Sequence, residues 1–134
     1  LPSDIAIFSA AVSDFKVTEK KKDKIKKQEN ISISLEKNID ILAYVSNHNS
    51  MRPKLVIGFA AETTDLEKNA IGKLMNKNCD WIIANDVSKR NCGFGCDYNE
   101  VTIHYDKNRK EKLSHKKKSE ISEEIVDRIV NQMN

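Results

Sequence analysis

Glycine is scarce in this sequence, and its scarcity removes the two commonest phosphate-binding motifs. The chain of 134 residues has 4 glycines, namely Gly58, Gly72, Gly93 and Gly95. Neither G-x-G-x-x-G nor G-x-x-x-x-G-K-[ST] occurs, so neither type of glycine-rich loop can hold phosphates through its backbone amides. Any nucleotide that this chain binds must therefore be held in another way.

Cysteine is also scarce, and the 3 cysteines are an odd number. Without a secretory signal, this count favours reduced thiols over a disulfide framework. A metal site is the weaker alternative, in which Cys92 and Cys96 would be joined by Cys79 and His104. Zinc sites of the knuckle type have two compact ligand pairs, whereas these candidates are scattered over separate segments.

Long apolar runs and a strong net charge are absent as well. No apolar run approaches the roughly 20 residues of a membrane span, and the start LPSDIAIFSA lacks the basic region of a signal peptide. Lys and Arg (23) nearly balance Asp and Glu (20), so charge alone does not predict a nucleic-acid partner. We expect one soluble, cytoplasmic domain over residues 1–134, with no membrane or nucleic-acid partner.

Strand-like and helix-like segments alternate along the chain, which predicts an α/β domain with a mainly parallel sheet. Continuous apolar runs predict buried strands, and alternation of apolar and polar residues predicts half-buried strands near a sheet edge. Apolar stripes at helical spacing predict helices. The predicted buried strands are 5–12 and 54–61, a further short strand is 81–84, the alternating strands are 31–35 and 101–105, and the helices are 40–47, 65–78 and a C-terminal helix from Ser119 onward.

Residues 16–30 are mostly charged, with Val17 and Ile25 as their apolar side chains. Such a segment cannot pack into a core. We expect an exposed, flexible, lysine-rich flap. An alternative function follows from its charge, because this segment and residues 107–118 would form the basic arms of a module that binds RNA or another polyanion.

Two features of the α/β pattern are candidate ligand contacts. Lys73 and Lys77 lie one helical turn apart, so their ammonium groups can converge on one polyanion. Asp14 follows the first strand at the carboxyl edge, where open α/β sheets bind ligands. Solvated surface lysines and a turn-forming aspartate are the structural alternatives.

Five sequence blocks connect the chain to a known family. They are SAAVSDF at 9–15, KIKK at 24–27, NIDIL at 38–42, GFAAET at 58–63 and ANDVS at 84–88. Together they resemble the synthetase domain of phosphopantothenoylcysteine synthetase, from Asp4 to about Ile129. The resemblance implies a Rossmann-like, three-layer α/β domain whose mainly parallel sheet has an antiparallel edge extension.

The resemblance also implies a reaction. The family joins 4'-phosphopantothenate to cysteine with CTP and Mg²⁺, through an acyl-cytidylate, and releases pyrophosphate and CMP. Mg²⁺ is expected to be held through the phosphates, without direct protein ligands. The resemblance further implies a homodimer and fusion to a flavin-dependent decarboxylase, and a member that uses ATP is the alternative. We expect the dimer contact at the alternating strands 31–35 and 101–105.

By resemblance, Lys24 is the main catalytic residue, which stabilises the acyl-transfer step, and it also contacts the nucleotide. Lys73 and Lys77 are expected to hold the triphosphate. Ala10 and Ala11 are expected to lie against the substrate or the intermediate. The remaining predicted nucleotide contacts are Phe8, Ser9, Ala10, Asp14, Asn38, Ile39, Asp40, Ile41 and Phe59.

Two departures from the family pattern affect these expectations. Ile39 stands where family sequences usually have proline, so the backbone of the pocket loses a rigid turn. The family domain also begins upstream with a strand and an Asn-His-Ser-Ser-Gly motif, so we expect the chain to be an N-terminally truncated domain that binds CTP without full activity.

Overall fold

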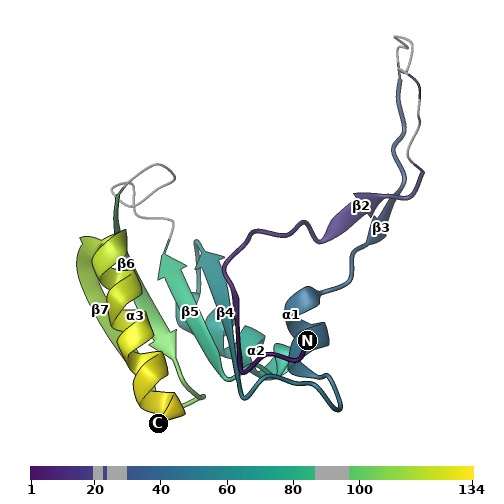
Figure 1. Cartoon of the computed structure of the whole chain (residues 1–134). Coiled ribbons are helices and arrows are strands. Elements are labelled where there is room, and N and C mark those ends of the chain that lie inside the picture. Colours follow the sequence, from purple (N-terminus) through teal and green to yellow (C-terminus); the bar gives the residue numbers. More distant parts are fainter. Residues whose placement is uncertain (20–22, 24–29, 87–96) are drawn as a thin grey trace.

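The structure is a computed structural model that describes residues 1–19, 23, 30–86 and 97–134. It contains a five-stranded sheet of order β1-β4-β5-β6-β7 and a separate two-stranded sheet of β2 and β3 (Figure 1). The elements are β1 Ile5–Phe8, β2 Phe15–Val17, β3 Leu35–Lys37, α1 Ile41–Ser46, β4 Leu55–Glu62, α2 Leu66–Lys77, β5 Trp81–Asp86, β6 Tyr98–His104, β7 Lys110–Lys117 and α3 Lys118–Met133.

The main sheet is mixed and lies between two layers of helices. Strands β1, β4 and β5 pair in parallel, and β6 and β7 extend the sheet in antiparallel pairing. Helix α3 covers one face, and α1 and α2 lie on the other (Figure 1). The predicted Rossmann-like α/β class, with three layers and an antiparallel extension, is confirmed.

Strand β4 is central, as its continuous apolar run predicts. Val56 and Ile57 point to opposite faces of the sheet and are both fully buried. On the α3 face, the core consists of Leu55, Ile57, Trp81, Ile83, Val101, Ile103, Leu113, Ile121, Ile125 and Ile129. On the α2 face, it consists of Val56, Ala60, Ala70, Leu74, Cys79, Ile82 and Ala84.

Helix α3 owes its position to isoleucines that recur every four residues. Ile121, Ile125 and Ile129 are buried, as this spacing predicts, whereas Val126 and Val130 are half exposed. The helix begins at Lys118, slightly before the predicted Ser119. The Glu120 carboxylate accepts a hydrogen bond of 2.9 Å from the backbone N–H of Lys117, which satisfies one free donor at this end of the helix.

The strand expected at 31–35 was predicted to be half-buried, and this prediction is wrong. Ile31, Ile33 and Leu35 are 54%, 65% and 58% exposed. Strand β3 begins only at Leu35 and pairs with β2, and the two strands form an arm that projects from the main sheet (Figure 1). Of the predicted strand only Leu35 belongs to β3, and no second layer within the described residues covers the apolar side chains.

The first strand and the flap also differ from the sequence reading. Strand β1 ends at Phe8, not at residue 12, and residues 9–14 form the connection to the arm. Lys16 and Val17, which were expected in the flap, belong to β2. Residues 20–22 and 24–29 of the predicted flap lie outside the described residues.

Strand β7 was not predicted, because Leu113 is its one buried residue in a run of charged and polar side chains. Its presence changes the role of β6. Strand β6 pairs with β5 on one side and with β7 on the other, so its backbone is not free for a contact between subunits. A sheet-mediated contact through the edge of 101–105 is therefore not available, and the dimer itself stays a prediction.

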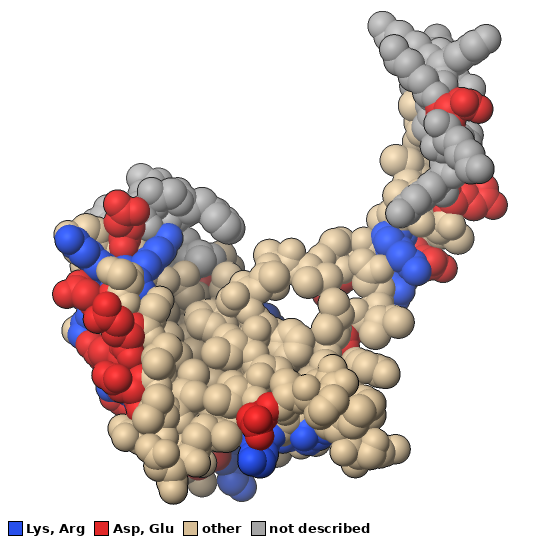
Figure 2. Space-filling view, in the orientation of Figure 1, with Lys and Arg blue, Asp and Glu red and all other residues tan. Residues whose placement is uncertain are grey.

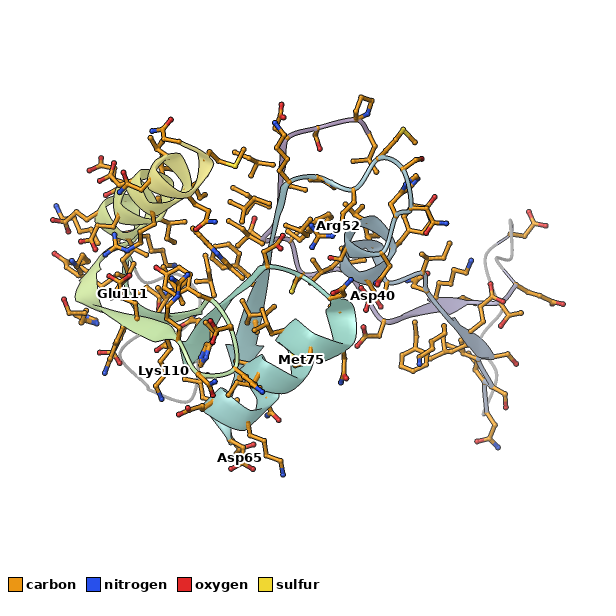
Figure 3. All side chains as sticks on the ribbon, turned by 90° about the horizontal axis from the view of Figure 1, so that it is seen from below. Asp40, Arg52, Asp65, Met75, Lys110 and Glu111 are labelled. Carbon is orange, nitrogen blue, oxygen red and sulfur yellow. The ribbon has the colours of Figure 1, made fainter. Side chains whose placement is uncertain are left out.

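Arg52 connects several elements from the start of β4, and sequence reasoning did not single it out. Its guanidinium donates to the carbonyls of Ser46 and Asn78, at the ends of α1 and α2, and to Asp80 Oδ2 at 3.1 Å. Asp80 Oδ2 in turn accepts from the Val56 N–H at 2.7 Å. Arg52 thus satisfies carbonyls that the helix ends leave unpaired, and it lies beside α1 (Figure 3).

Gly58 allows α1 to pack closely on the sheet, and this gives a stability prediction. A Cβ at this position would lie 2.6 Å from Leu42 Cδ2 and 2.9 Å from Ile82 Cδ1. Replacement of Gly58 by Ala should lower the free energy of unfolding by about 1–2 kcal/mol, because Ile82 is buried and its surroundings must shift. Urea denaturation measures this change.

Gly72 provides the matched control for that substitution. It lies inside α2, and a Cβ there would meet no atom within 4 Å. Gly72→Ala should therefore raise the free energy of unfolding by about 0.5–1 kcal/mol through helix propensity. Equal effects of the two substitutions would contradict the close packing of α1 on Gly58.

A charged network joins α3 to β7 and gives a prediction about pH. Arg128 Nε donates to Glu111 Oε2 at 2.9 Å, and the Tyr105 hydroxyl donates to the same oxygen at 2.7 Å. These two hydrogen bonds lower the pKa of Glu111 to about 2, from an ordinary value of 4.5. Figure 3 shows Glu111 beside α3.

A carboxylate whose pKa is lowered by folding stabilises the protein above its unfolded pKa and loses this contribution as the pH falls towards its folded pKa. The difference in the free energy of unfolding between the protein and a Glu111→Gln variant should therefore be constant above about pH 5. It should shrink as the pH falls from 4.5 to 2. Thermal unfolding at several pH values measures it. Replacement of the exposed Glu123 by Gln on α3 controls for net charge, and the same pH profile in both variants would contradict the network's role.

Candidate functional site

The candidate site lies where the parallel strands of the sheet end. Strands β1 and β4 finish at Phe8 and Glu62, and residues 9–14 then leave the sheet towards the arm. In Figure 2 an opening is visible between this connection and the surface below it, which includes α1. Ligands of open α/β sheets bind outside the carboxyl ends of the strands.

Asn38 holds the connection from β1 in place. Its backbone N–H donates to the Asp14 carbonyl at 2.8 Å, and its side-chain amide donates to the Ser13 carbonyl at 2.8 Å. Two predicted nucleotide residues, Asp14 and Asn38, are therefore brought together across the base of the arm. The Asp14 side chain itself is exposed, so its carboxylate is accessible to a ligand.

Asp40 begins α1 and contacts Lys77 at the end of α2. Its carboxylate accepts a hydrogen bond of 2.9 Å from the Ala43 N–H, as an N-cap does, and it forms an ion pair with the Lys77 ammonium. Burial acts to raise the pKa of Asp40, but the Ala43 hydrogen bond and Lys77 together hold it below its ordinary value. Asp40 is therefore charged at neutral pH and joins the two helices.

Lys73 lies against the last residue of β4. Its ammonium is 2.7 Å from Glu62 Oε1, in an ion pair without hydrogen-bond alignment. The Lys73 side chain is 44% exposed and that of Glu62 is 14% exposed. Both predicted triphosphate lysines are thus held by carboxylates and also remain accessible to solvent.

The predicted contacts do not all lie on one face of the sheet. Phe8 packs with Leu42 against the core on the α2 face. Phe59 alternates with Gly58 and Ala60 along β4 and so points to the opposite face, where it is 38% exposed. Ser9, Ala10 and Ala11 follow β1 and are exposed, and Ile39 and Ile41 are 75% and 47% exposed at the start of α1.

Comparison with known proteins identifies the family. The sequence matches the family described as DNA/pantothenate metabolism flavoprotein C-terminal domain over residues 1–133. The chain belongs to this family.

Curated relatives agree with this assignment. The coenzyme A biosynthesis bifunctional protein CoaBC of Bacillus subtilis is 40% identical over 128 residues, which cover 95% of this chain and 31% of that protein. The protein of the same name from Haemophilus influenzae is 43% identical over 129 residues, which cover 96% of this chain and 32% of that protein. The chain therefore spans about a third of the length of these relatives.

Solved structures agree as well. The C-terminal domain of CoaBC superposes with a TM-score of 0.72 at 31% identity, over 97% of this chain and 55% of that chain. The DNA/pantothenate metabolism flavoprotein from Streptococcus pneumoniae has a TM-score of 0.68 at 22% identity and supports the fold alone. The family named from the sequence motifs is confirmed.

Several residues of interest in this family member lie outside the described part of the chain. They include Lys24, the predicted catalytic lysine, and Cys92 and Cys96 of the alternative metal site. Within the described residues, no three His, Cys, Asp or Glu side chains are grouped to hold one metal ion. Cys79 is buried, and burial raises the pKa of its thiol to about 11, so it is protonated at neutral pH.

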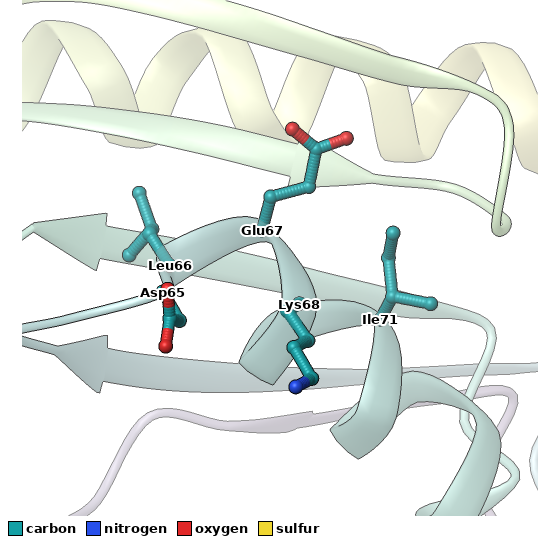
Figure 4. Close-up of a pocket in the computed structure, with 5 residues that line it drawn as sticks. All are labelled: Asp65, Leu66, Glu67, Lys68 and Ile71. Carbon is teal, nitrogen blue, oxygen red and sulfur yellow. The ribbon is translucent and has the colours of Figure 1, made fainter.

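Two hollows among the described residues lie away from the predicted nucleotide contacts. One depression covers the first turns of α2 and is lined by Asp65, Leu66, Glu67, Lys68 and Ile71 (Figure 4). Another hollow, of about 540 Å³, lies at the amino ends of β4 and β5, beside Lys54 and Trp81. The hydrogen bonds and ion pairs around residues 8–14 and 38–41 identify the carboxyl edge as the candidate site, because strand ends position ligands there.

Sequence reasoning missed two residues of this site. Glu62 belongs to the GFAAET block but was not given a role, and Asn69 was not considered. Asn69 donates to Glu62 Oε2 at 3.2 Å and to the Thr64 carbonyl at 2.9 Å. The available signal was the position of Glu62 at the end of a buried strand, directly before the helix that carries Lys73.

No helix in the described part of this family member is long and apolar enough to cross a membrane.

Proposed function

We propose that this domain is the synthetase part of a coenzyme A biosynthesis protein, a ligase that joins 4'-phosphopantothenate to L-cysteine. One observation carries the proposal: two accessible lysines on α2 are held by carboxylates in a domain of this family, Lys73 by Glu62 at the carboxyl end of β4 and Lys77 by Asp40 at the start of α1. Lysines in fixed positions stabilise the negative charge that develops during phosphoryl and acyl transfer.

The reaction takes place in two steps. The carboxylate of 4'-phosphopantothenate attacks the α-phosphate of CTP, which forms an acyl-cytidylate and releases pyrophosphate. The amine of cysteine then attacks the acyl carbon, loses a proton and displaces CMP, so the product is an amide. Lys24 stabilises the acyl-transfer step, while Lys73 and Lys77 hold the triphosphate.

Mg²⁺ enters with the nucleotide in this proposal. The carboxylates nearest the two lysines, Glu62 and Asp40, are already engaged in ion pairs, and a hard cation prefers phosphate oxygens when it arrives as a nucleotide complex. Bound in this way, Mg²⁺ supplies charge that stabilises the departing pyrophosphate. The residues of this chain bind and orient the phosphates.

The projecting arm fits a second copy of the chain. Phe15, Val17 and Leu35 lie on one side of it with Lys37, whereas Lys16 and Glu36 form an ion pair of 3.1 Å on the other side. Ile31 and Ile33, just before β3, are exposed. An isolated two-stranded sheet has little stability in water, and its apolar side requires a partner. A homodimer that pairs two arms covers both apolar sides at once.

Product analysis of the full-length protein that contains this domain, incubated with 4'-phosphopantothenate, cysteine, CTP and Mg²⁺, tests the proposed ligase. The proposal predicts that phosphopantothenoylcysteine, CMP and pyrophosphate are formed in equal amounts. Release of CDP and phosphate in place of CMP and pyrophosphate would contradict the acyl-cytidylate route.

Replacement of Lys24 by Gln in the complete synthetase domain should slow the second step more than the first. Since the amide cannot neutralise charge that develops during acyl transfer, product formation should fall about a hundredfold or more while acyl-cytidylate accumulates. Mass spectrometry of the quenched reaction detects the intermediate. Lys68→Gln, on the exposed part of α2, is the control, and loss of the intermediate in Lys24→Gln would overturn the assigned role.

A further inference from the structure

Glu62 is the most confined charged residue among the candidate site's ion pairs. It ends β4, and its side chain is 14% exposed, against 41% for Asp40 in the neighbouring pair. Its two carboxylate oxygens face different partners. Oε1 is 2.7 Å from the Lys73 ammonium, and Oε2 accepts a hydrogen bond of 3.2 Å from the Asn69 amide.

Asn69 in turn is fixed by the chain segment between β4 and α2. Its side-chain amide donates to the Thr64 carbonyl at 2.9 Å, and its backbone N–H donates to the Asp65 carbonyl at 2.9 Å. Glu62, Thr64 and Asn69 are therefore locked together where the strand turns into the helix. This arrangement fixes the Glu62 carboxylate before any ligand is present.

Lys73 gains a preferred position from this fixed carboxylate. A lysine side chain has several freely rotating bonds, and the entropy lost when they are ordered opposes binding. An ammonium has three N–H donors, and its contact with Glu62 Oε1 is an ion pair without hydrogen-bond alignment. Donors therefore remain for a phosphate, and 44% exposure of the Lys73 side chain leaves access to them.

We propose that Glu62 is a positioning residue that holds Lys73 ready for the outer phosphates of the nucleotide. This inference rests on the proposed function. Positioning matters in this domain because the sequence has neither of the common glycine-rich phosphate loops, so side chains must provide the pre-formed contacts.

A competing electrostatic effect makes the proposal testable, because the two effects change the affinity for CTP in opposite directions. Glu62 is negative and repels a triphosphate, so removal of its charge alone would strengthen nucleotide binding. Removal of a positioning group would weaken it. The direction of change in the affinity for CTP therefore distinguishes a positioning residue from a counter-charge that only occupies Lys73 until the nucleotide arrives.

Calorimetric titration of the protein and its Glu62→Gln variant with CTP and with CMP, each with Mg²⁺, tests the proposal. We expect about a tenfold loss of CTP affinity, the size of one charge-assisted contact, and no change for CMP, which lacks the outer phosphates. A merely structural role would weaken both ligands equally. Unchanged or tighter CTP binding would overturn the inference.

Controls separate the inference from the proposed function. Glu67→Gln removes an exposed glutamate of α2 that pairs with Lys110 and should leave both affinities unchanged. In a Lys73→Met background, where no lysine is left to position, Glu62→Gln should not weaken CTP binding further, and an additive loss would contradict positioning through Lys73. If Glu62→Gln unfolds, Asn69→Ala is expected to show the same selective loss of CTP affinity. If the unaltered protein does not bind CTP, the proposed function itself fails.

Discussion

Replacement of both Lys73 and Lys77 by Ala is expected to weaken CTP binding by about a hundredfold or more, since each charged contact contributes about 1.5–3 kcal/mol. The two ammonium groups lie one turn apart on α2 and are held by Glu62 and Asp40. Their loss removes positive charge from the helix that is proposed to contact the triphosphate. Calorimetric titration in the presence of Mg²⁺ measures the change.

Two controls make this result specific. Lys68→Ala removes a lysine from the same helix, where it lines the depression of Figure 4, and should leave CTP affinity unchanged. Lys77→Ala also breaks the contact between α1 and α2, so its thermal stability must be measured beside its affinity. CTP binding that persists in the double variant would remove the lysine pair from the site.

Replacement of Ile33 by Asp is expected to convert a homodimer into monomers. Ile33 is 65% exposed, two residues before β3 of the arm, and burial of an aspartate without a partner between two arms costs several kcal/mol. That loss is about a thousandfold in the dissociation constant. Light scattering across a wide concentration range measures the mass.

The matched control is Val126→Asp on α3. Val126 is 53% exposed, so it is also an exposed aliphatic residue, but it lies on a helix away from the arm. Its variant should keep the mass of the unaltered protein. A monomeric mass for the unaltered protein at all concentrations would contradict the proposed dimer.

The elements that sequence reasoning predicted well are those whose pattern is strong and local. Strand β4 is a continuous apolar run, and α3 has an isoleucine every four residues. A continuous apolar run is expected where a strand is buried on both faces, and an apolar stripe is expected where a helix is buried on one face. Asp40 was expected at the start of a helix, and its carboxylate does accept the Ala43 N–H.

The elements that were missed or misplaced depend on contacts far apart in the sequence. Strand β7 has a single buried residue, Leu113, and is held by backbone pairing with β6. The alternation at 31–35 predicted extended chain, but alternation cannot show whether another layer covers the apolar side. Met75 fits the apolar stripe of α2 and is nevertheless 64% exposed, because the stripe is wider than the surface that the helix covers.

The candidate site was predictable in part. The lysine pair followed from helical spacing, whereas the remaining predicted contacts came from the family resemblance. The carboxylates that hold the lysines were not predictable, since Glu62 and Lys73 meet only after β4 and α2 have packed together. Phe59 was expected with the other contacts, but the direction of a side chain in a central strand depends on register, and a shift of one residue reverses the face.

Titration of the protein with CTP and with ATP, each with Mg²⁺, tests the central claim most directly. The account predicts CTP binding that is stronger than ATP binding and that depends on Lys73 and Lys77. Binding of neither nucleotide, or equal binding of both that survives loss of the two lysines, would contradict a CTP site at the carboxyl edge of this sheet.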